Sequence, residues 1–229
     1  MKIAGIQPLT LLDFPGHTAM IVFTQGCPFR CAYCHNPELL STQTPSALDE
    51  QEVLCMLKTR LRMLDGVVVT GGEPTVHPDL PAFLASIKAL GLEIKLDTNG
   101  AHPRMLEQML RDGLVDYVAM DIKFPWSRYD EVARTGSSAI AENCRRSFRL
   151  LQTYDIAHEF RTTVCPGMHT EQDLLQIARD LLPGESYYLQ AMRPGKTLDP
   201  TLPAGPGLDL MKIASRMCEA FPGVDVRVR

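Results

Sequence analysis

Short β-rich runs alternate with longer amphipathic stretches along almost the whole chain, and this alternation limits the fold more than any other feature. Most runs expected as strands end at Gly, Pro or Asn-Gly signals, and together they cover residues 19–24, 67–70, 93–96, 115–122, 159–164, 186–191 and 224–228. The stretches expected as helices cover residues 49–64, 81–90, 103–112, 139–154, 171–182 and 208–221. Repeated strand–helix order implies a parallel sheet with right-handed crossovers.

The number of strand–helix units narrows the architecture further. Six units in succession are too few for a closed eight-fold barrel. We therefore expect an α/β fold, a partial (β/α)6 TIM-like barrel that is open laterally, with a doubly wound open sheet as the alternative. We expect one domain over residues 1–229, with a core at about 13–191, followed at 192–229 by a loop, a helix and a strand. The Pro- and Gly-rich stretch 193–207 predicts a long irregular loop, and such loops often have a function.

Composition excludes some classes of partner. The formal net charge is −4, so we expect no broad nucleic-acid surface. No apolar run approaches the roughly 20 residues of a membrane span, and residues 1–5 lack the pattern of a signal peptide. We expect a cytoplasmic protein with neither a membrane nor a nucleic acid as partner. Its seven cysteines should then stay reduced, which favours metal binding or buried free thiols over disulfides.

Three of the cysteines, Cys27, Cys31 and Cys34, lie within eight residues directly after the first predicted strand. A structural zinc site normally takes four protein ligands, and His17 or His35 could be the fourth. Three buried reduced thiols are the simpler alternative. An iron–sulfur cubane usually takes four cysteines, so three would leave one iron open to a substrate or cofactor.

The spacing C-x3-C-x2-C, with the aromatic Tyr33 just before the third cysteine, resembles the radical S-adenosylmethionine superfamily. The segment Gly71-Gly72-Glu73-Pro74, after the second predicted strand, resembles the GGEP motif of the same family. The resemblance implies a [4Fe–4S] cluster on the three cysteines. Its open iron would bind the amino and carboxylate groups of S-adenosylmethionine, and reductive cleavage would yield a 5′-deoxyadenosyl radical that abstracts a hydrogen atom.

Further segments resemble the enzymes that activate glycyl-radical enzymes. They are the Cys-His-Asn continuation at 34–36, the Asp-Phe-Pro-Gly turn at 13–16, and the segments at 96–100 and 120–123. By resemblance to pyruvate formate-lyase activating enzymes, a monovalent cation would have its ligands among Asp97, Thr98, the Ala119 carbonyl and Asp121. The residues implied as cofactor contacts are Tyr33, Asn36, Gly71, Gly72, Glu73, Asn99, Lys123, Arg161 and Gln190. Gln190 stands in the region where the formate-lyase activase has a histidine.

The predicted sheet agrees with this grouping, because Glu73, Asp97, Asp121, Lys123 and Arg161 all fall in or near the carboxyl ends of strands, which meet at one mouth in a βα barrel. Each also has a structural alternative, for example a turn cap at Asp97 or an ion pair between Asp121 and Lys123.

The pattern resembles most closely the activating proteins of anaerobic ribonucleoside-triphosphate reductase, from residue 13 to about residue 190. That resemblance implies this glycyl-radical enzyme as partner and a flavodoxin- or ferredoxin-like electron donor. Two alternatives stay open: a radical S-adenosylmethionine enzyme acting on a small molecule, such as a 7-carboxy-7-deazaguanine synthase, and a zinc-binding interaction protein. The remaining cysteines, at positions 55, 144, 165 and 218, are expected to be buried thiols.

Overall fold

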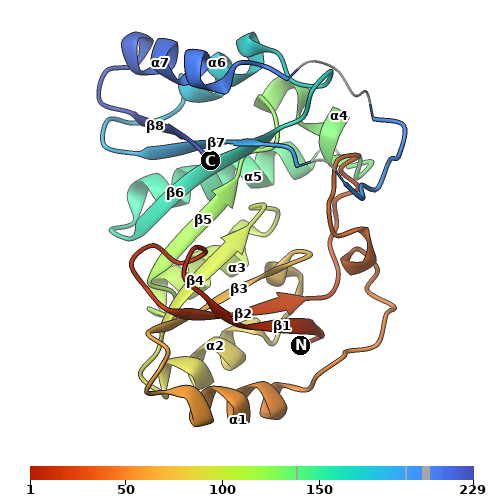
Figure 1. The fold of residues 1–229 in the computed structure, drawn as a ribbon, viewed down its shortest axis with the longest axis vertical. Helices are drawn as coiled ribbons and strands as arrows, with labels where there is room; N and C mark the ends of the chain where they lie inside the picture. Colours follow the sequence, from red (N-terminus) through yellow and green to blue (C-terminus); the bar gives the residue numbers. More distant parts are fainter. Residues whose placement is uncertain (138, 194, 203–206) are drawn as a thin grey trace.

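The computed structural model describes residues 1–137, 139–193, 195–202 and 207–229. One curved sheet follows the chain order, β1-β2-β3-β4-β5-β6-β7-β8 (Figure 1). Its strands are β1 (Ile3–Thr10), β2 (Ala19–Thr24), β3 (Gly66–Gly71), β4 (Glu93–Thr98), β5 (Tyr117–Asp121), β6 (Ala157–Val164), β7 (Ser186–Ala191) and β8 (Asp225–Val228). Every neighbouring pair is parallel except β1 and β2.

The helices connect successive strands on one side of this sheet, as Figure 1 shows for α2, α3 and α5. They are α1 (Glu50–Arg60), α2 (Leu80–Lys88), α3 (Pro103–Arg111), α4 (Tyr129–Ala133), α5 (Ala139–Thr153), α6 (Glu171–Ala178) and α7 (Leu210–Ala220). Short 3-10 turns are η1 (Pro37–Leu39), η2 (Pro74–Val76) and η3 (Trp126–Arg128). Among the described residues β1 does not pair with β8, so the barrel is open. The expected partial, laterally open barrel is confirmed, and all seven predicted strands are present.

Strand β1 is the element that the sequence did not predict. Its Gly5 and Pro8 weaken any strand pattern, and most of its residues are partly or fully exposed. It is an edge strand, antiparallel to β2, and a proline is tolerated there because one side of an edge has no ladder to complete. The extra strand lies before the six predicted strand–helix units and does not alter them.

Local signals explain where the helices begin. Asp49 and Glu52 form a capping box at the start of α1, in which each side chain accepts from the other residue's backbone amide. Thr170 and Asp173 do the same for α6. Pro103 stands at the first turn of α3, where its missing amide costs no hydrogen bond.

The two faces of the sheet differ sharply in polarity. Val118 and Met120 of β5 point to the main apolar core under the helices and are fully buried. The alternate residues of the strand, Tyr117 and Asp121, point to the inner face. At one end of that inner face, Phe14 packs with Ala19, Ile21 and Val68 in a second, smaller apolar cluster. The polar groups of the inner face are therefore held between this apolar cluster and the mouth of the barrel.

Part of the predicted loop 193–207 packs on the cysteine segment. The amide of Leu198 donates to the carbonyl of Cys34 over 3.0 Å, and the amide of Asp199 donates to that of Ala32 over 2.9 Å. The two segments lie side by side at one edge of the view in Figure 1. Residues 194 and 203–206 of this loop lie outside the described residues, and α7 begins at Leu210 rather than at residue 208.

Candidate functional site

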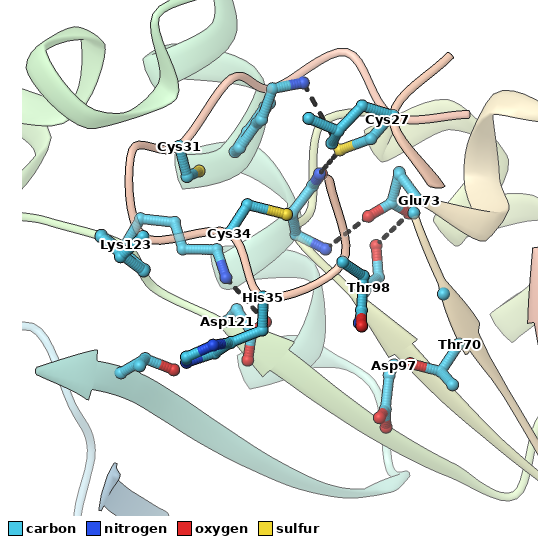
Figure 2. A pocket seen from close by; sticks show the side chains of 18 of the residues that line it. Cys27, Cys31, Cys34, His35, Thr70, Glu73, Asp97, Thr98, Asp121 and Lys123 are labelled. Carbon is cyan, nitrogen blue, oxygen red and sulfur yellow. Dashed lines mark hydrogen bonds and ion pairs between the residues drawn. The ribbon is translucent and has the colours of Figure 1, made fainter. Parts of the chain in front are cut away.

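The three clustered cysteines line one cavity together with the ends of strands β3 to β6 (Figure 2). They lie on the loop after β2, whose shape is fixed by backbone hydrogen bonds on both sides. The amide of Gly26 donates to Leu39 over 2.7 Å, and the amide of Arg30 donates to Ala133 over 2.8 Å. Cys31 is buried, and Cys27 and Cys34 are partly exposed toward the cavity.

Two glycines allow the end of β3 to approach this loop. A Cβ on Gly71 would lie 2.3 Å from the Thr24 amide nitrogen, and its φ of +119° is a conformation that side chains disfavour. A Cβ on Gly72 would lie 2.2 Å from the carbonyl oxygen of Gly26. Both positions therefore accept only glycine without a shift of the backbone.

Glu73 follows these glycines and is 1% exposed. Its carboxylate accepts from the Thr98 hydroxyl over 2.7 Å and from the Asn99 amide over 2.6 Å. The Thr75 hydroxyl donates to the same carboxylate over 2.5 Å. These donors satisfy the buried carboxylate and fix its orientation at the cavity wall (Figure 2).

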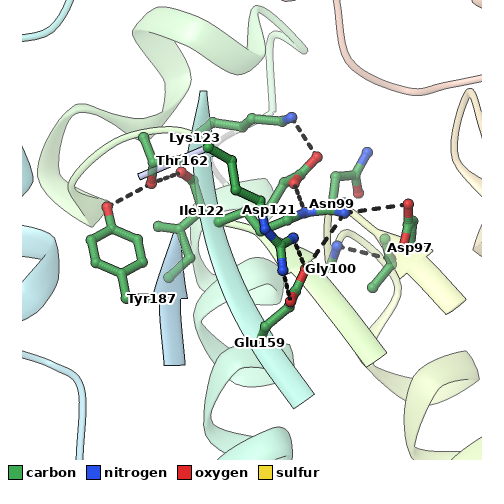
Figure 3. A network of polar contacts seen from close by, with 12 residues as sticks. Asp97, Asn99, Gly100, Asp121, Ile122, Lys123, Glu159, Thr162 and Tyr187 are labelled. Atoms are coloured by element: carbon green, nitrogen blue, oxygen red, sulfur yellow. Dashed lines mark hydrogen bonds and ion pairs between the residues drawn. The ribbon is translucent and has the colours of Figure 1, made fainter. Parts of the chain in front are cut away.

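A cluster of opposite charges on the inner face of the sheet lines part of the cavity. Arg161 donates to Asp97 and Asp121. Figure 3 shows both aspartates within this network of polar contacts. Arg161 Nε donates to Asp121 over 2.9 Å, and Lys123 Nζ donates to the other oxygen of Asp121 over 2.9 Å. Burial raises the pKa of Asp121, but the positive charges of Arg161 and Lys123 lower it by more than burial raises it. The pKa of Asp121 therefore lies well below its usual range. Asp121 is therefore a carboxylate at any physiological pH.

Most of the residues expected at the site line this cavity. They are Cys27, Cys31, Tyr33, Cys34, Asn36, Gly71, Gly72, Glu73, Asp97, Thr98, Asn99, Asp121, Lys123 and Arg161. Two expected residues do not line it. Ala119 is buried inside β5, and Gln190 pairs with Thr163 between β6 and β7.

The cavity also contains residues that sequence reasoning missed, namely Phe29, Leu40, Thr70 and Thr163. Thr163 could have been found, because it lies two residues after Arg161 on β6 and so shares its face. Thr70 could have been found as the residue before the paired glycines at the end of β3. Phe29 and Leu40 carry no comparable signal, because only the path of the loop brings them to the wall.

The donor set fits an iron–sulfur cluster. Burial, followed by the charge of Glu73, raises the pKa of Cys27 to about 12, and burial raises the pKa of Cys31 to about 11, so these thiols need a metal to become thiolates. Two buried polar atoms at the cavity, the Tyr33 hydroxyl and His35 Nε2, have no hydrogen-bond partner among the described residues. Such orphaned atoms are expected where a bound group completes a site.

A single zinc ion fits less well. Within the described ranges, no three His, Cys, Asp or Glu side chains are placed to hold one metal ion. A tetrahedral zinc site draws its sulfurs to about 2.3 Å from one centre. A cubane instead takes each cysteine on a separate iron, which suits thiols spread along one cavity wall.

The other cysteines only partly follow expectation. Cys144 and Cys165 are buried, as predicted, whereas Cys55 and Cys218 are exposed, which corrects the prediction for these two. The reason is helical phase. On α1 the buried positions are Val53, Leu54 and Leu57, and Cys55 falls on the opposite face.

Comparison with known proteins identifies the family of the chain. Residues 21–181 match the family model of the radical SAM superfamily. The chain is 29% identical over 200 residues to a protein of Methanocaldococcus jannaschii named as a candidate glycyl-radical enzyme activating enzyme, covering 86% of this chain and 82% of that protein.

It is also 34% identical over 127 residues to the pyruvate formate-lyase-activating enzyme of Clostridium pasteurianum, which covers 53% of this chain and 52% of that enzyme. The chain thus matches only about half the length of that relative. Among solved structures, QueE from Escherichia coli superposes with a TM-score of 0.59 at 18% identity, over 99% of this chain and 92% of QueE. This similarity supports the fold alone. No helix in the described part of the chain is both long and apolar enough to span a membrane.

Proposed function

Because this chain belongs to the radical SAM superfamily, we propose that it is an activating enzyme that binds a [4Fe–4S] cluster and S-adenosylmethionine and installs a glycyl radical on a partner enzyme. When bound, the reduced cluster supplies the electron that splits the sulfonium cofactor into methionine and a 5′-deoxyadenosyl radical. The partner proposed is anaerobic ribonucleoside-triphosphate reductase, with a flavodoxin or ferredoxin as electron donor. The sheet runs from Ile3 to Val228, which supports the proposal that residues 1–229 form one domain.

Different residues of the cavity are proposed to bind the cluster and the separate groups of the cofactor. Cys27, Cys31 and Cys34 are the proposed cluster ligands. The buried carboxyl group of Glu73, held in place by its donors, is suited to accept hydrogen bonds from an ammonium group, which favours the amino group of the cofactor. Lys123 and Arg161 provide positive charge for the carboxylate of the cofactor. Tyr33, Asn36 and Asn99 line the same wall and are proposed to contact the cofactor. The Gln190 contact remains a proposal without support from the cavity.

The observation that carries the proposal of a protein substrate is the open barrel. A glycine Cα–H belongs to the backbone of a folded partner, so a loop of that partner must enter the site. The described strands leave β1 and β8 unpaired with each other, and the cavity lies at the carboxyl ends of the strands between them. This geometry suits an inserted loop better than a closed barrel would.

Electron paramagnetic resonance tests the function directly. The protein is reconstituted without oxygen, reduced, and mixed with S-adenosylmethionine and anaerobic ribonucleoside-triphosphate reductase. We expect the doublet of a glycyl radical on the reductase, and none with the Cys34→Ala variant. Cofactor cleavage with no radical on the reductase would exclude this partner, and no radical on any glycyl-radical enzyme tested would favour a small-molecule substrate. Zinc without sulfide in the anaerobically purified protein would exclude the enzyme altogether.

A further inference from the structure

The two carboxylates expected to hold a monovalent cation are already fully paired with side-chain cations. Lys95 Nζ lies 2.5 Å from Asp97 Oδ1, and Arg161 Nη1 lies 3.4 Å from Asp97 Oδ2. Arg161 Nε lies 2.9 Å from Asp121 Oδ1, and Lys123 Nζ lies 2.9 Å from Asp121 Oδ2. Each of the four carboxylate oxygens therefore has a cationic partner, and no oxygen faces the cavity without one.

The other residues expected as cation ligands also have hydrogen-bond or strand partners already. The Thr98 hydroxyl donates to Glu73 over 2.7 Å and accepts from the Gly100 amide over 3.0 Å. Ala119 lies inside β5, paired with Asp97 on one side and Glu159 on the other, and is fully buried. A metal ion at this place would have to displace existing partners rather than fill an open site.

Lys95 is the unusual member of the group. It is 2% exposed, although lysine is rarely so buried without a specific partner. It lies two residues before Asp97 on β4, so both side chains point to the inner face, where the ammonium also lies 5.9 Å from the ring centre of Tyr117. A buried lysine on a strand costs free energy through desolvation, and the pairing with Asp97 offsets that cost.

The cations of this group outnumber its acids. Lys95, Lys123 and Arg161 carry three positive charges against the two negative charges of Asp97 and Asp121, a surplus of one. The nearby carboxylate of Glu159 is paired with Arg229, whose two nitrogens donate over 3.0 and 3.1 Å, and Arg161 Nη1 lies 3.9 Å from it. Counting Glu159 and Arg229 together therefore leaves the surplus at one. A surplus of one positive charge matches one carboxylate of the sulfonium cofactor. Another cation placed between Asp97 and Asp121 would meet net repulsion from Lys95, Lys123 and Arg161 in a low-dielectric site. The remaining acid of the cavity wall, Glu73, is the residue proposed to bind the amino group of the cofactor.

We propose that Lys95 is a positioning residue whose buried ammonium takes the place that a monovalent cation occupies in pyruvate formate-lyase activating enzymes. This chain would then bind S-adenosylmethionine without a monovalent metal cation. The inference rests on the proposed function in that S-adenosylmethionine is taken as the ligand. Lys95 acts through Asp97, which itself lines the cavity and faces Arg161. It neutralises Asp97, so the two charges of Lys123 and Arg161, which Asp121 balances only in part, can still attract the cofactor carboxylate.

The test measures cofactor affinity rather than turnover, and it needs no partner enzyme. The dissociation constant of S-adenosylmethionine is measured by calorimetry on the reconstituted holoenzyme, in tetramethylammonium chloride and in potassium or sodium chloride at equal ionic strength. For the native protein we expect a change of less than about twofold between the salts. For Lys95→Met we expect affinity to fall on the order of tenfold in tetramethylammonium, because Asp97 is left unpaired, and to recover in potassium.

Lys88→Met is the matched control. Lys88 also forms an ion pair, with Asp116 over 2.7 Å, but neither residue lines the cavity. Its cofactor affinity should equal that of the native protein in every salt. An affinity of the native protein that collapses in tetramethylammonium, or a Lys95→Met variant that binds as the native protein does there, would overturn the inference. Lost affinity in Lys95→Met that potassium does not restore would also overturn it, because a merely structural lysine predicts that result.

A second measurement uses the native protein alone and so stands even if the variant fails to fold. Thallium(I) replaces potassium in such sites, and thallium-205 resonance detects it when bound. We expect no saturable bound signal in the native holoenzyme, and a bound signal there would refute the inference. If S-adenosylmethionine binds in no salt at all, it is the proposed function that fails, and the thallium titration still decides the role of Lys95.

Discussion

The backbone amide of Glu73 donates to the carbonyl oxygen of Gly26 over 2.8 Å, which ties the glycine motif after β3 to the residue just before the first clustered cysteine. This contact lies just beyond the paired strands β2 and β3, where the Thr24 hydroxyl donates to the carbonyl of Thr70, 46 residues further along the chain. It exists only because Gly72, between these strands' ends, presents no side chain to Gly26.

Replacing Gly72 by Ala should therefore separate the two motifs. The added Cβ would lie 2.2 Å from the Gly26 oxygen and 2.9 Å from that of Leu39, both backbone atoms that cannot turn aside. We expect a loss of about 2 kcal/mol in the free energy of unfolding and weaker retention of iron. Gly5→Ala is the control, since nothing lies within 4 Å of a Cβ there. Equal urea midpoints for the two variants would contradict this account of the contact.

Cys34→Ala should abolish binding of the cluster, because the remaining two thiols of the loop leave a second iron without a protein ligand. Iron and sulfide analysis together with the visible absorption spectrum measures this directly. Cys55→Ala is the control, since Cys55 is exposed on the outer face of α1. Full iron content in Cys34→Ala, or cofactor cleavage by it, would show that the cluster lies elsewhere.

Asp121→Ala should weaken cofactor binding while leaving the iron content intact. The substitution removes the ion-pair partner of Lys123 and the nearest partner of Arg161, so these two long cationic side chains are held less firmly in a buried site. We expect the dissociation constant of S-adenosylmethionine to rise on the order of tenfold. Asp116→Ala, which removes an acid outside the cavity, should leave it unchanged. Unaltered affinity in Asp121→Ala would refute its role at the cofactor.

A histidine away from the cavity predicts a pH dependence of stability. His158 Nε2 lies 3.5 Å from the Glu185 carboxylate, too far for a good hydrogen bond but close enough for ionic attraction. Burial lowers the pKa of His158, but Glu185 and the Ile156 carbonyl raise it more, so the net pKa lies above its ordinary value. The folded protein thus holds a proton that the unfolded chain releases first.

The stabilisation from this pair is complete below the unfolded pKa of about 6.5 and is lost as pH rises through the higher folded pKa. We expect the urea midpoint, measured without oxygen, to fall over that interval. In His158→Gln this part of the pH dependence should vanish. A midpoint equally dependent on pH in the native protein and the variant would mean that other groups are responsible.

The strand order and the shared mouth of the site were predictable because each depends on a local pattern. Seven runs ended by turn signals gave the parallel strands, and acidic or basic residues at the ends of those runs gave Glu73, Asp121 and Arg161 at one cavity. In a parallel sheet all carboxyl ends meet at one edge, so position along the chain is enough to group such residues in space.

The pairing inside that group was not predictable. The alternation of β4 places Lys95 on the inner face of the sheet. The neighbouring residues in the sequence do not reveal whether its ammonium pairs with Asp97 or reaches solvent, because that depends on the curvature of the sheet. The exposed Cys55 and Cys218 were missed because a cysteine fits either face of an amphipathic helix. Strand β1 was missed because an edge strand tolerates residues that an inner strand excludes.

The segment that packs on the cysteine loop has a consequence for how the protein is made. The carbonyls of Ala32 and Cys34 accept from the amides of Asp199 and Leu198, which leave the ribosome long after the cysteines themselves. During synthesis the thiols are therefore carried on an incompletely braced loop for most of the time that translation takes. Iron and sulfide that arrive before residues 198 and 199 have been made would meet a loop that lacks these two hydrogen bonds, so we expect the cluster to be held firmly only after this segment has packed on the cysteines.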